Sequence, residues 1–279
     1  MNKREILGWG LYHIGKMFHR NENFLSLYFH DPTPELFEQI VKWCKERKYR
    51  FIDINECYNI LSSKTDIKEK VVYLSFDDGW NRNLKLLPIV EKYNAPITIF
   101  VTTEPIDSGN YWWEYADMSG EKDKKSNLKF LKHSQFVKEI ARLKKNIKLQ
   151  RSSITEEELT TLAKHPLVSL QSHTVTHPIL INCSQETLDK ELVDSKKYLE
   201  EKTGENIIAF SYPNGDFGDR EVRAVDNAGY RIAFTTKPTV IDTTNPGNLL
   251  LVPRKAINTN GGKYENLAKI IGVWQKIKR

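Results

Sequence analysis

Residues 71–79 read VVYLSFDDG, a strand-like run that ends in two adjacent carboxylates. Five of the six residues 71–76 are β-branched, aromatic or otherwise apolar, as in a buried strand, and Asp77, Asp78 and Gly79 follow directly. Neighbouring carboxylates raise each other's pKa, and a buried carboxylate is costly unless a cation lies beside it. The stretch therefore predicts a strand that delivers two acids to a site holding a positive charge.

Short apolar runs alternate with helical patterns on both sides of this strand. Such alternation is typical of parallel β-α units. The number of runs favours a distorted, TIM-like (β/α) barrel of about seven parallel strands over an open sheet. Strands are expected at 24–29, 50–54, 71–76, 97–102, 167–171, 207–210, 230–235 and 249–252, and helices at about 32–47, 82–93, 155–164, from 184 onward and 263–277.

Residues 103–150 do not fit the alternation, and we interpret them as an insertion in a barrel domain spanning 24–279, preceded by an extension at 1–23. Long insertions at strand ends usually serve function. The insertion contains Trp112 and Trp113. We expect both to lie near the barrel mouth and bind substrate, because sugar rings pack well on indole faces. The alternative is that they anchor the insertion to the barrel.

Composition narrows the class of partner and the location. The 279 residues carry a net charge of +6, but acids and bases are interspersed and no basic stripe indicates a nucleic-acid groove. Three cysteines without a C-x-x-C pair predict neither a disulfide framework nor a zinc ribbon. The apolar stretch 6–14 is short, broken by glycines and followed by no cleavage site, so a cytoplasmic location is expected. A surface helix that contacts a membrane is the alternative.

Polar clusters follow four of the expected strands. Because the carboxyl ends of barrel strands meet on one face, these clusters should lie together. His173 and His177 have a spacing that can direct both imidazoles at one metal ion. With one acid from another strand they would form a facial ligand set, and the second acid would be free to act as a base. The clusters are His30-Asp31, Asp77-Asp78-Gly79, 172–178 and 211–215.

Over roughly residues 24–260 the chain resembles the polysaccharide deacetylases, carbohydrate esterases with a NodB-type domain. Residues 75–79 (SFDDG) are similar to that family's T-F-D-D-G motif, residues 173–178 (HTVTHP) match its H-S/T-x-x-H-P motif, and 211–215 (SYPNG) partly match R-x-P-x-G. The resemblance implies a distorted barrel that binds a divalent metal, Zn²⁺ with Co²⁺ or Ni²⁺ as alternatives. It also implies removal of acyl groups, mostly N-acetyl, from amino sugars.

The resemblance assigns roles residue by residue. Asp77 corresponds to the catalytic base. The backbone N–H of Asn214 corresponds to the oxyanion donor, and Tyr212 beside it is expected to contact substrate. The implied metal ligands are Asp78, His173 and His177.

The chain departs from the family pattern at two catalytic positions. Ser211 stands where the family has an arginine that orients the base, and residues 251–254 (LVPR) stand where an L-x-H motif supplies a histidine acid. We expect Arg254 to contact Asp77 and replace the missing arginine, although a surface salt bridge is an equal alternative. His30, at the end of the first strand, is the expected acid.

These observations favour a hydrolase of non-peptide carbon–nitrogen bonds. The expected reaction is metal-dependent removal of an N-acetyl or other acyl group from a carbohydrate, a polysaccharide or a glycan precursor. One alternative is a deformylase or other hydrolase of a non-polymeric amide with the same fold. Another is a non-catalytic metal- or glycan-binding domain, although retention of Asp77 argues against it.

Overall fold

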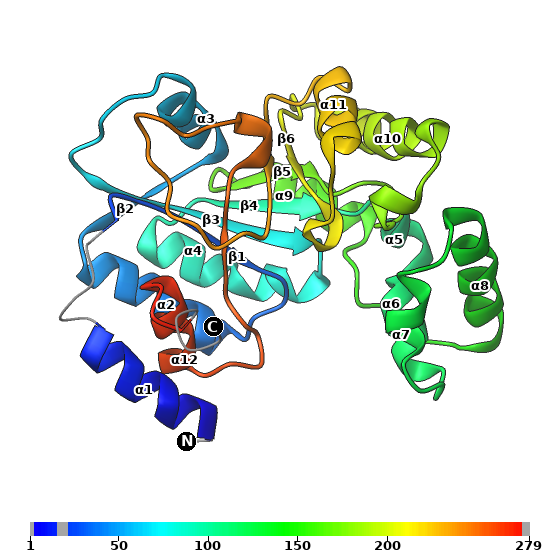
Figure 1. Cartoon of the computed structure of the whole chain (residues 1–279), viewed down its shortest axis with the longest axis horizontal. Helices are drawn as coiled ribbons and strands as arrows, with labels where there is room; N and C mark the ends of the chain where they lie inside the picture. Colours follow the sequence, from blue (N-terminus) through cyan, green and yellow to red (C-terminus); the bar gives the residue numbers. More distant parts are fainter. Residues whose placement is uncertain (1–2, 16–21, 275–279) are drawn as a thin grey trace.

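The computed structural model describes residues 3–15 and 22–274 and places a parallel sheet at the centre of the molecule (Figure 1). Every strand pair in this sheet is parallel. The strands are β1 (Phe24–Phe29), β2 (Tyr49–Ile52), β3 (Lys70–Asp78), β4 (Ile97–Val101), β5 (Val168–Ser172), β6 (Ala209–Ser211), β7 (Ile232–Phe234) and β8 (Lys255–Ala256).

β3 organises the sheet. β1 pairs along one edge of β3, and the other edge is shared between β2, which pairs with residues 70–73, and β4, which pairs with residues 74–78. The strand order is β7-β6-β5-β4-β3-β1-β8, and Val252 bridges back to Phe234 of β7. Residues 252–256 thus contact both β7 and β1, so the sheet curls toward closure. The predicted distorted barrel of parallel strands is confirmed.

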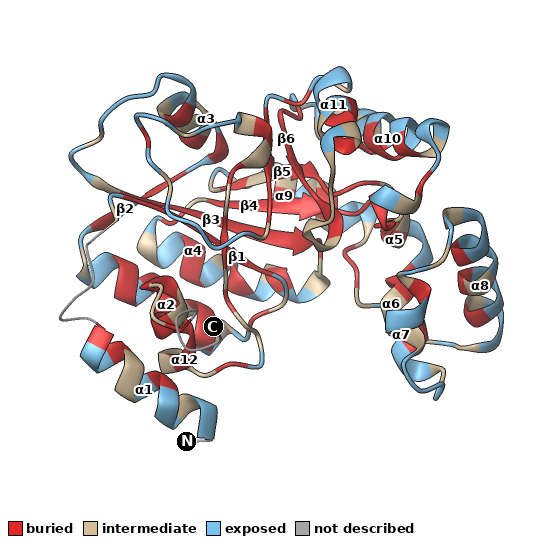
Figure 2. Cartoon of the chain, in the orientation of Figure 1, coloured by how far each residue is buried: buried red, intermediate tan, exposed pale blue. Residues whose placement is uncertain are grey.

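Helices surround the sheet, and Figure 2 shows buried strands beneath helices whose outer faces are exposed. The helices that pack around the barrel are α1 (Lys3–Gly15), α2 (Pro34–Glu46), α3 (Ile54–Ser62), α4 (Leu87–Tyr93), α9 (Glu156–Ala163), α10 (Gln185–Thr203), α11 (Asp219–Asn227) and α12 (Lys263–Ile270). The 3₁₀ turns are η1 (Asn81–Leu86), η2 (Leu180–Asn182), η3 (Pro213–Gly215) and η4 (Leu249–Leu251).

Four further helices between β4 and β5 lie to one side of the sheet (Figure 1). Three of them share an apolar cluster of their own, built on Trp112, Phe136 and Ile140 and joined by Ile179 from the segment after β5, whereas Ile106 of the first belongs to the barrel core. The insertion is thereby packed against the barrel face where the strands end. These helices are α5 (Glu104–Ser108), α6 (Trp112–Met118), α7 (Lys124–Leu128) and α8 (His133–Asn146).

Several expected elements differ in the structure. The helix expected at 82–93 is divided into the 3₁₀ turn η1 and the helix α4. The strand expected at 249–252 is wrong: residues 249–251 form η4, whose first turn is capped by the Asn248 side chain, and only Val252 makes a bridge. The strand expected at 50–54 ends at Ile52, because Asp53 accepts a hydrogen bond from the Glu56 N–H and begins α3. The last helix ends at Ile270, and residues 275–277 of the expected helix lie outside the described residues.

Helix α1 packs on α12. The Glu5 carboxylate accepts hydrogen bonds from the backbone N–H groups of Tyr264 (2.9 Å) and Glu265 (3.1 Å), in the first turn of α12, where a negative charge is favoured. Ile6, Leu7, Trp9 and Ile14 of α1 stay exposed. Contact of this surface with a membrane remains a prediction. Among the described residues, none of the helices combines the length and apolar character needed to cross a bilayer.

The close approach of α1 to α12 depends on Gly8. A Cβ atom there would lie 2.5 Å from the Glu265 backbone nitrogen, whereas a Cβ at Gly10 would meet nothing within 4 Å. We expect Gly8→Ala to lower the free energy of unfolding by about 1–3 kcal/mol through overpacking. Gly10→Ala, the matched control, should raise it by up to about 1 kcal/mol. Urea unfolding of both variants tests this, and equal effects would contradict the close packing.

Candidate active site

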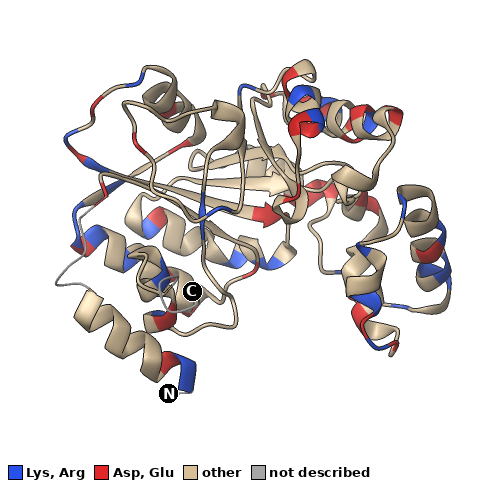
Figure 3. Ribbon diagram, viewed as in Figure 1, with Lys and Arg blue, Asp and Glu red and all other residues tan. Residues whose placement is uncertain are grey.

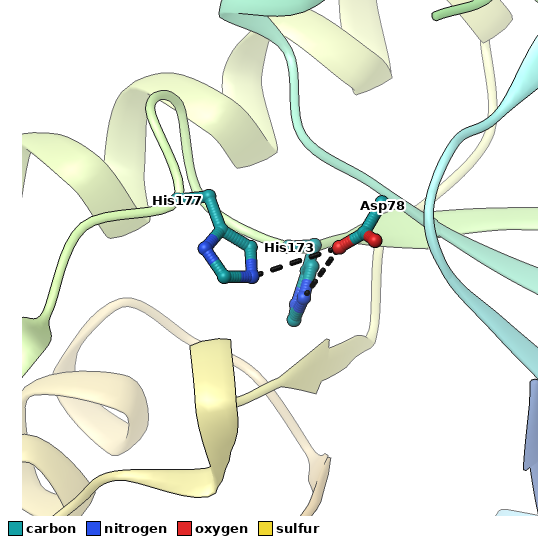
Figure 4. A group of neighbouring side chains, drawn as sticks. All are labelled: Asp78, His173 and His177. Atoms are coloured by element: carbon teal, nitrogen blue, oxygen red, sulfur yellow. Dashed lines mark ion pairs between the residues drawn. The ribbon is translucent and has the colours of Figure 1, made fainter. Parts of the chain in front are cut away.

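The carboxyl ends of β3 and β5 bring one carboxylate and two imidazoles together (Figure 4). Asp78 is the last residue of β3, His173 directly follows β5, and His177 lies in the loop that continues from it. Nε2 of His173 is 3.5 Å and Nε2 of His177 is 3.6 Å from Asp78 Oδ1. Ligand atoms in a tetrahedral zinc site, with bonds of about 2.0–2.1 Å, are about 3.3 Å apart. The three buried side chains are therefore spaced for one small cation.

Hydrogen bonds hold Asp78 and His173 so that their remaining ligand atoms face one another. Trp80 Nε1 donates to Asp78 Oδ2 at 2.9 Å. His173 Nδ1 lies 2.7 Å from the Ser211 carbonyl oxygen, so it carries the proton and leaves Nε2 free to coordinate. Asp78 Oδ1 is buried and has no hydrogen-bond partner in the described chain. A buried carboxylate oxygen that has no hydrogen-bond partner and faces two imidazoles is suited to bind a divalent cation.

The electrostatics of Asp78 agree with this fit. Burial raises the pKa of Asp78, against the lowering effect of His30 and His173. A cation beside the carboxylate would favour the ionised form that burial disfavours. Figure 3 shows the acidic tip of β3 against the mostly uncharged strands of the sheet.

The loop that carries the two histidines is held by Glu191 of α10. Its carboxylate accepts from the backbone N–H groups of Val175 (2.8 Å) and Thr176 (2.9 Å) and from the Thr176 hydroxyl (2.7 Å). Thr174 and His177 have φ values of +71° and +53°, a conformation that costs energy for residues with side chains. The contacts of Glu191 hold the loop in this conformation.

Sequence reasoning missed Glu191, although one signal was present. Leu188 and Leu192 define the buried face of α10, and Glu191 lies three residues after Leu188, on that same face. A carboxylate on the apolar face of a helix needs a partner. The partner here is the polar loop after β5.

Arg254 binds Asp77 at the floor of the site. It is fully buried, and its Nη1 and Nη2 atoms lie 2.7 and 2.8 Å from the two carboxylate oxygens. The remaining donors go to Ser75 Oγ (3.0 Å), Ser211 Oγ (2.7 Å) and the Thr235 carbonyl (3.3 Å). All five guanidinium N–H groups are thus engaged. The contact expected between Arg254 and Asp77 is confirmed.

Ser211 explains how an arginine from the segment before β8 can reach this position. Its hydroxyl accepts from Arg254 and lies 3.3 Å from Asp77 Oδ2. The short side chain therefore leaves room for the guanidinium beside the carboxylate. Burial alone would raise the pKa of Asp77, but Arg254, and after it His173, hold this pKa at about 2. Asp77 is ionised at neutral pH.

A cavity of about 360 Å³ opens above these groups. His30 lines it from the end of β1, as expected, and its side chain is exposed. Tyr212 and Asn214 line it from the segment after β6. The Tyr212 hydroxyl is buried and has no hydrogen-bond partner among the residues that the structure describes, and Asn214 has a φ of +57°. The proposed acid, substrate contact and oxyanion donor therefore share one cavity with Asp77, and their roles stay predictions.

The two tryptophans differ in their surroundings. Trp112 is 4% exposed, packs on Phe136, and donates from Nε1 to the His177 carbonyl at 2.9 Å. It anchors the insertion to the histidine loop. Trp113 lines the cavity, as Trp112 does, but it is only partly buried; its ring stacks on Tyr111 and meets the His177 ring edge-on at 4.6 Å. Trp113 is thus the better placed of the two to contact a sugar.

The chain is similar to known proteins along most of its length. The family profile described as polysaccharide deacetylase matches residues 64–233. YxkH of Bacillus subtilis is 25% identical over 203 residues, which are 72% of this chain and 57% of YxkH. The chain thus spans little more than half of that relative. The poly-beta-1,6-N-acetyl-D-glucosamine N-deacetylase of Staphylococcus aureus is 24% identical over 262 residues, 90% of this chain and 79% of the enzyme.

A solved structure has a similar fold. The deacetylase PplD of Streptococcus pyogenes, in complex with acetate, superposes with a TM-score of 0.65 and 25% identity, over 89% of this chain and 97% of PplD. The profile match covers both β3, with Asp77 and Asp78, and the loop after β5, with its two histidines. The match therefore covers Asp77, Asp78, His173 and His177, whereas His30 and Arg254 lie outside it.

Proposed function

The chain belongs to the polysaccharide deacetylase family, and from this premise we propose that it is a metal-dependent hydrolase that removes an N-acetyl group from an amino sugar of a glycan. The observation that carries the proposal is Asp77, bound on both oxygens by Arg254, beside the Asp78–His173–His177 cluster in one cavity. A pure binding site for a metal or a glycan would not need a buried carboxylate held ionised by an arginine.

Each residue of the site has a separate role in amide hydrolysis. Asp78, His173 and His177 would hold a divalent cation, which supplies Lewis acidity when bound. Asp77 accepts a proton from the water whose oxygen adds to the acetyl carbon, and Arg254 keeps it oriented and ionised. The Asn214 N–H donates to the oxyanion. His30 donates a proton to the amine as the carbon–nitrogen bond breaks, which releases acetate and an amino sugar.

Acetate release tests this function. The purified protein is incubated with Zn²⁺, Co²⁺ or Ni²⁺ and with β-1,6-linked N-acetylglucosamine oligomers, chitooligosaccharides or N-formylglucosamine. We expect acetate from at least one N-acetylated glycan and none after chelation by EDTA. Formate release without acetate release would favour the deformylase alternative. No product from any substrate with any of the metals would contradict the proposal.

Metal content provides a second test that does not depend on a substrate. We expect about one equivalent of Zn²⁺ per wild-type chain and almost none in His173→Ala, because two remaining ligands bind zinc poorly. His165→Ala is the matched control, since His165 pairs with Glu91 at 3.1 Å outside the cluster. Elemental analysis after dialysis measures both variants. Unchanged metal in His173→Ala would contradict the ligand assignment.

A further inference from the structure

Two lysines of the insertion reach the cavity above Asp77. Lys125 belongs to α7, and Lys129 follows that helix; both line the cavity and are half-buried. Asn182 of η2 donates its side-chain N–H to the Lys129 carbonyl at 2.8 Å. This bond fixes the backbone of Lys129 against the loop after β5, so the lysine is held at the cavity by the fold.

The ammonium group of Lys129 has no carboxylate partner among the described residues. Its hydrogen bond goes to the neutral Asn214 Oδ1, at 2.7 Å. Burial lowers the pKa of Lys129, Asp216 raises it from a distance, and Lys125 lowers it further. Lys125 is near enough to repel Lys129, and its own ion pair, with Asp117 at 3.1 Å, is exposed to solvent. Two cations thus lie close together at the cavity.

The carboxylates of the cavity do not neutralise these lysines. Among the described lining residues, the carboxylates are Asp77 and Asp78. Arg254 binds Asp77 on both oxygens, and Asp78 faces the two histidines. A neutral acetamido sugar could accept ordinary hydrogen bonds from the two ammonium groups, whereas an anionic group would gain the stronger charge-assisted hydrogen bonds.

We propose that Lys125 and Lys129 form a subsite for an anionic substituent, a phosphate or a carboxylate, on the sugar that enters the site or on its neighbour in the glycan. The proposal rests on the proposed function, since it names the class of glycan that the site selects. The subsite lies over Asn214, so the charged group would be held beside the acetamide without contacting Asp77.

Binding of deacetylated sugars tests the subsite without turnover. The Zn²⁺-loaded 279-residue protein is titrated with glucosamine 6-phosphate, muramic acid and glucosamine by ligand-detected NMR. We expect one of the two anionic sugars to bind about tenfold more tightly than glucosamine, because a charge-assisted hydrogen bond contributes about 1.5–3 kcal/mol. The preference should shrink at high salt, since surface charge interactions are screened. Which anionic sugar is preferred identifies the group as phosphate or carboxylate.

Variants separate the lysines from the metal and from Asn214. Lys129→Met is expected to lower the preference for the anionic sugar by about tenfold. Lys129→Arg should keep the preference, because it keeps the charge. Lys122→Met is the matched control: Lys122 lies in the same insertion, is exposed and does not line the cavity.

The outcomes separate the subsite from the proposed function. If Lys129→Met weakens all three sugars equally, Lys129 only positions Asn214 and the subsite is refuted. A wild-type protein that binds all three sugars equally refutes it as well. A protein that prefers an anionic sugar but releases acetate from no glycan keeps the subsite and refutes the deacetylase. A protein that releases acetate but has no preference for an anionic sugar keeps the deacetylase and refutes the subsite.

Discussion

Asp77→Asn is expected to lower kcat for acetate release by about 10²–10⁴-fold, the usual contribution of a positioned general base. Asparagine keeps the shape of the side chain but cannot accept the proton. The metal content should stay close to that of the wild type, because the cation would be held by Asp78 and the two histidines rather than by Asp77. The measurements are initial rates on the best glycan and elemental analysis of the same samples.

Asp31→Asn is the control for this prediction. Asp31 is a partly buried carboxylate that follows β1 and accepts from Arg82 Nε at 3.1 Å, and it does not line the cavity. Its kcat should stay close to that of the wild type. If Asp77→Asn were as active as this control, Asp77 would not be the base. If it lost the metal, Asp77 would belong to the ligand set.

The sequence predicted those residues of the site that directly follow a recognisable strand. Asp77 and Asp78 end a strand, and the two histidines follow another, so parallel pairing alone places them at one end of the barrel. Arg254 was predicted from the family resemblance, because Ser211 stands where the family has an arginine and Asp77 therefore needed another cation beside it. Such arguments succeed because the cost of an unpaired buried charge leaves few arrangements open.

Features that depend on distant packing were not predicted. Residues 249–252 have the composition of a strand, yet they close the barrel as a 3₁₀ turn followed by a single bridge, which depends on where β7 and β1 lie. The division of roles between Trp112 and Trp113 depends on how the insertion docks. Lys129 looked like one lysine among many in a charged segment, and only the fold shows that it reaches Asn214.

Arg254→Met is expected to lower the free energy of unfolding by about 3–5 kcal/mol, the usual cost of removing one partner of a buried ion pair. Methionine retains apolar volume beside the Tyr28 ring, over which the guanidinium carbon lies at 4.4 Å, so most of the loss should be electrostatic. Urea unfolding measures the change. Arg82→Met, which removes a solvent-exposed arginine from its ion pair with the partly buried Asp31, is the control and should cost less than Arg254→Met.

A double variant shows whether the loss of stability arises from the interaction between Asp77 and Arg254. Arg254→Met leaves the Asp77 carboxylate buried without its cation, and Asp77→Asn leaves the Arg254 guanidinium buried without its anion. The combination Asp77→Asn/Arg254→Met removes both charges, so it should be more stable than the sum of the single changes predicts, by about 1–3 kcal/mol. Additive effects would mean that Arg254 acts through packing alone. In that case Arg254 would fill the space of the arginine absent at Ser211 without supplying its charge, and another group would have to keep Asp77 ionised.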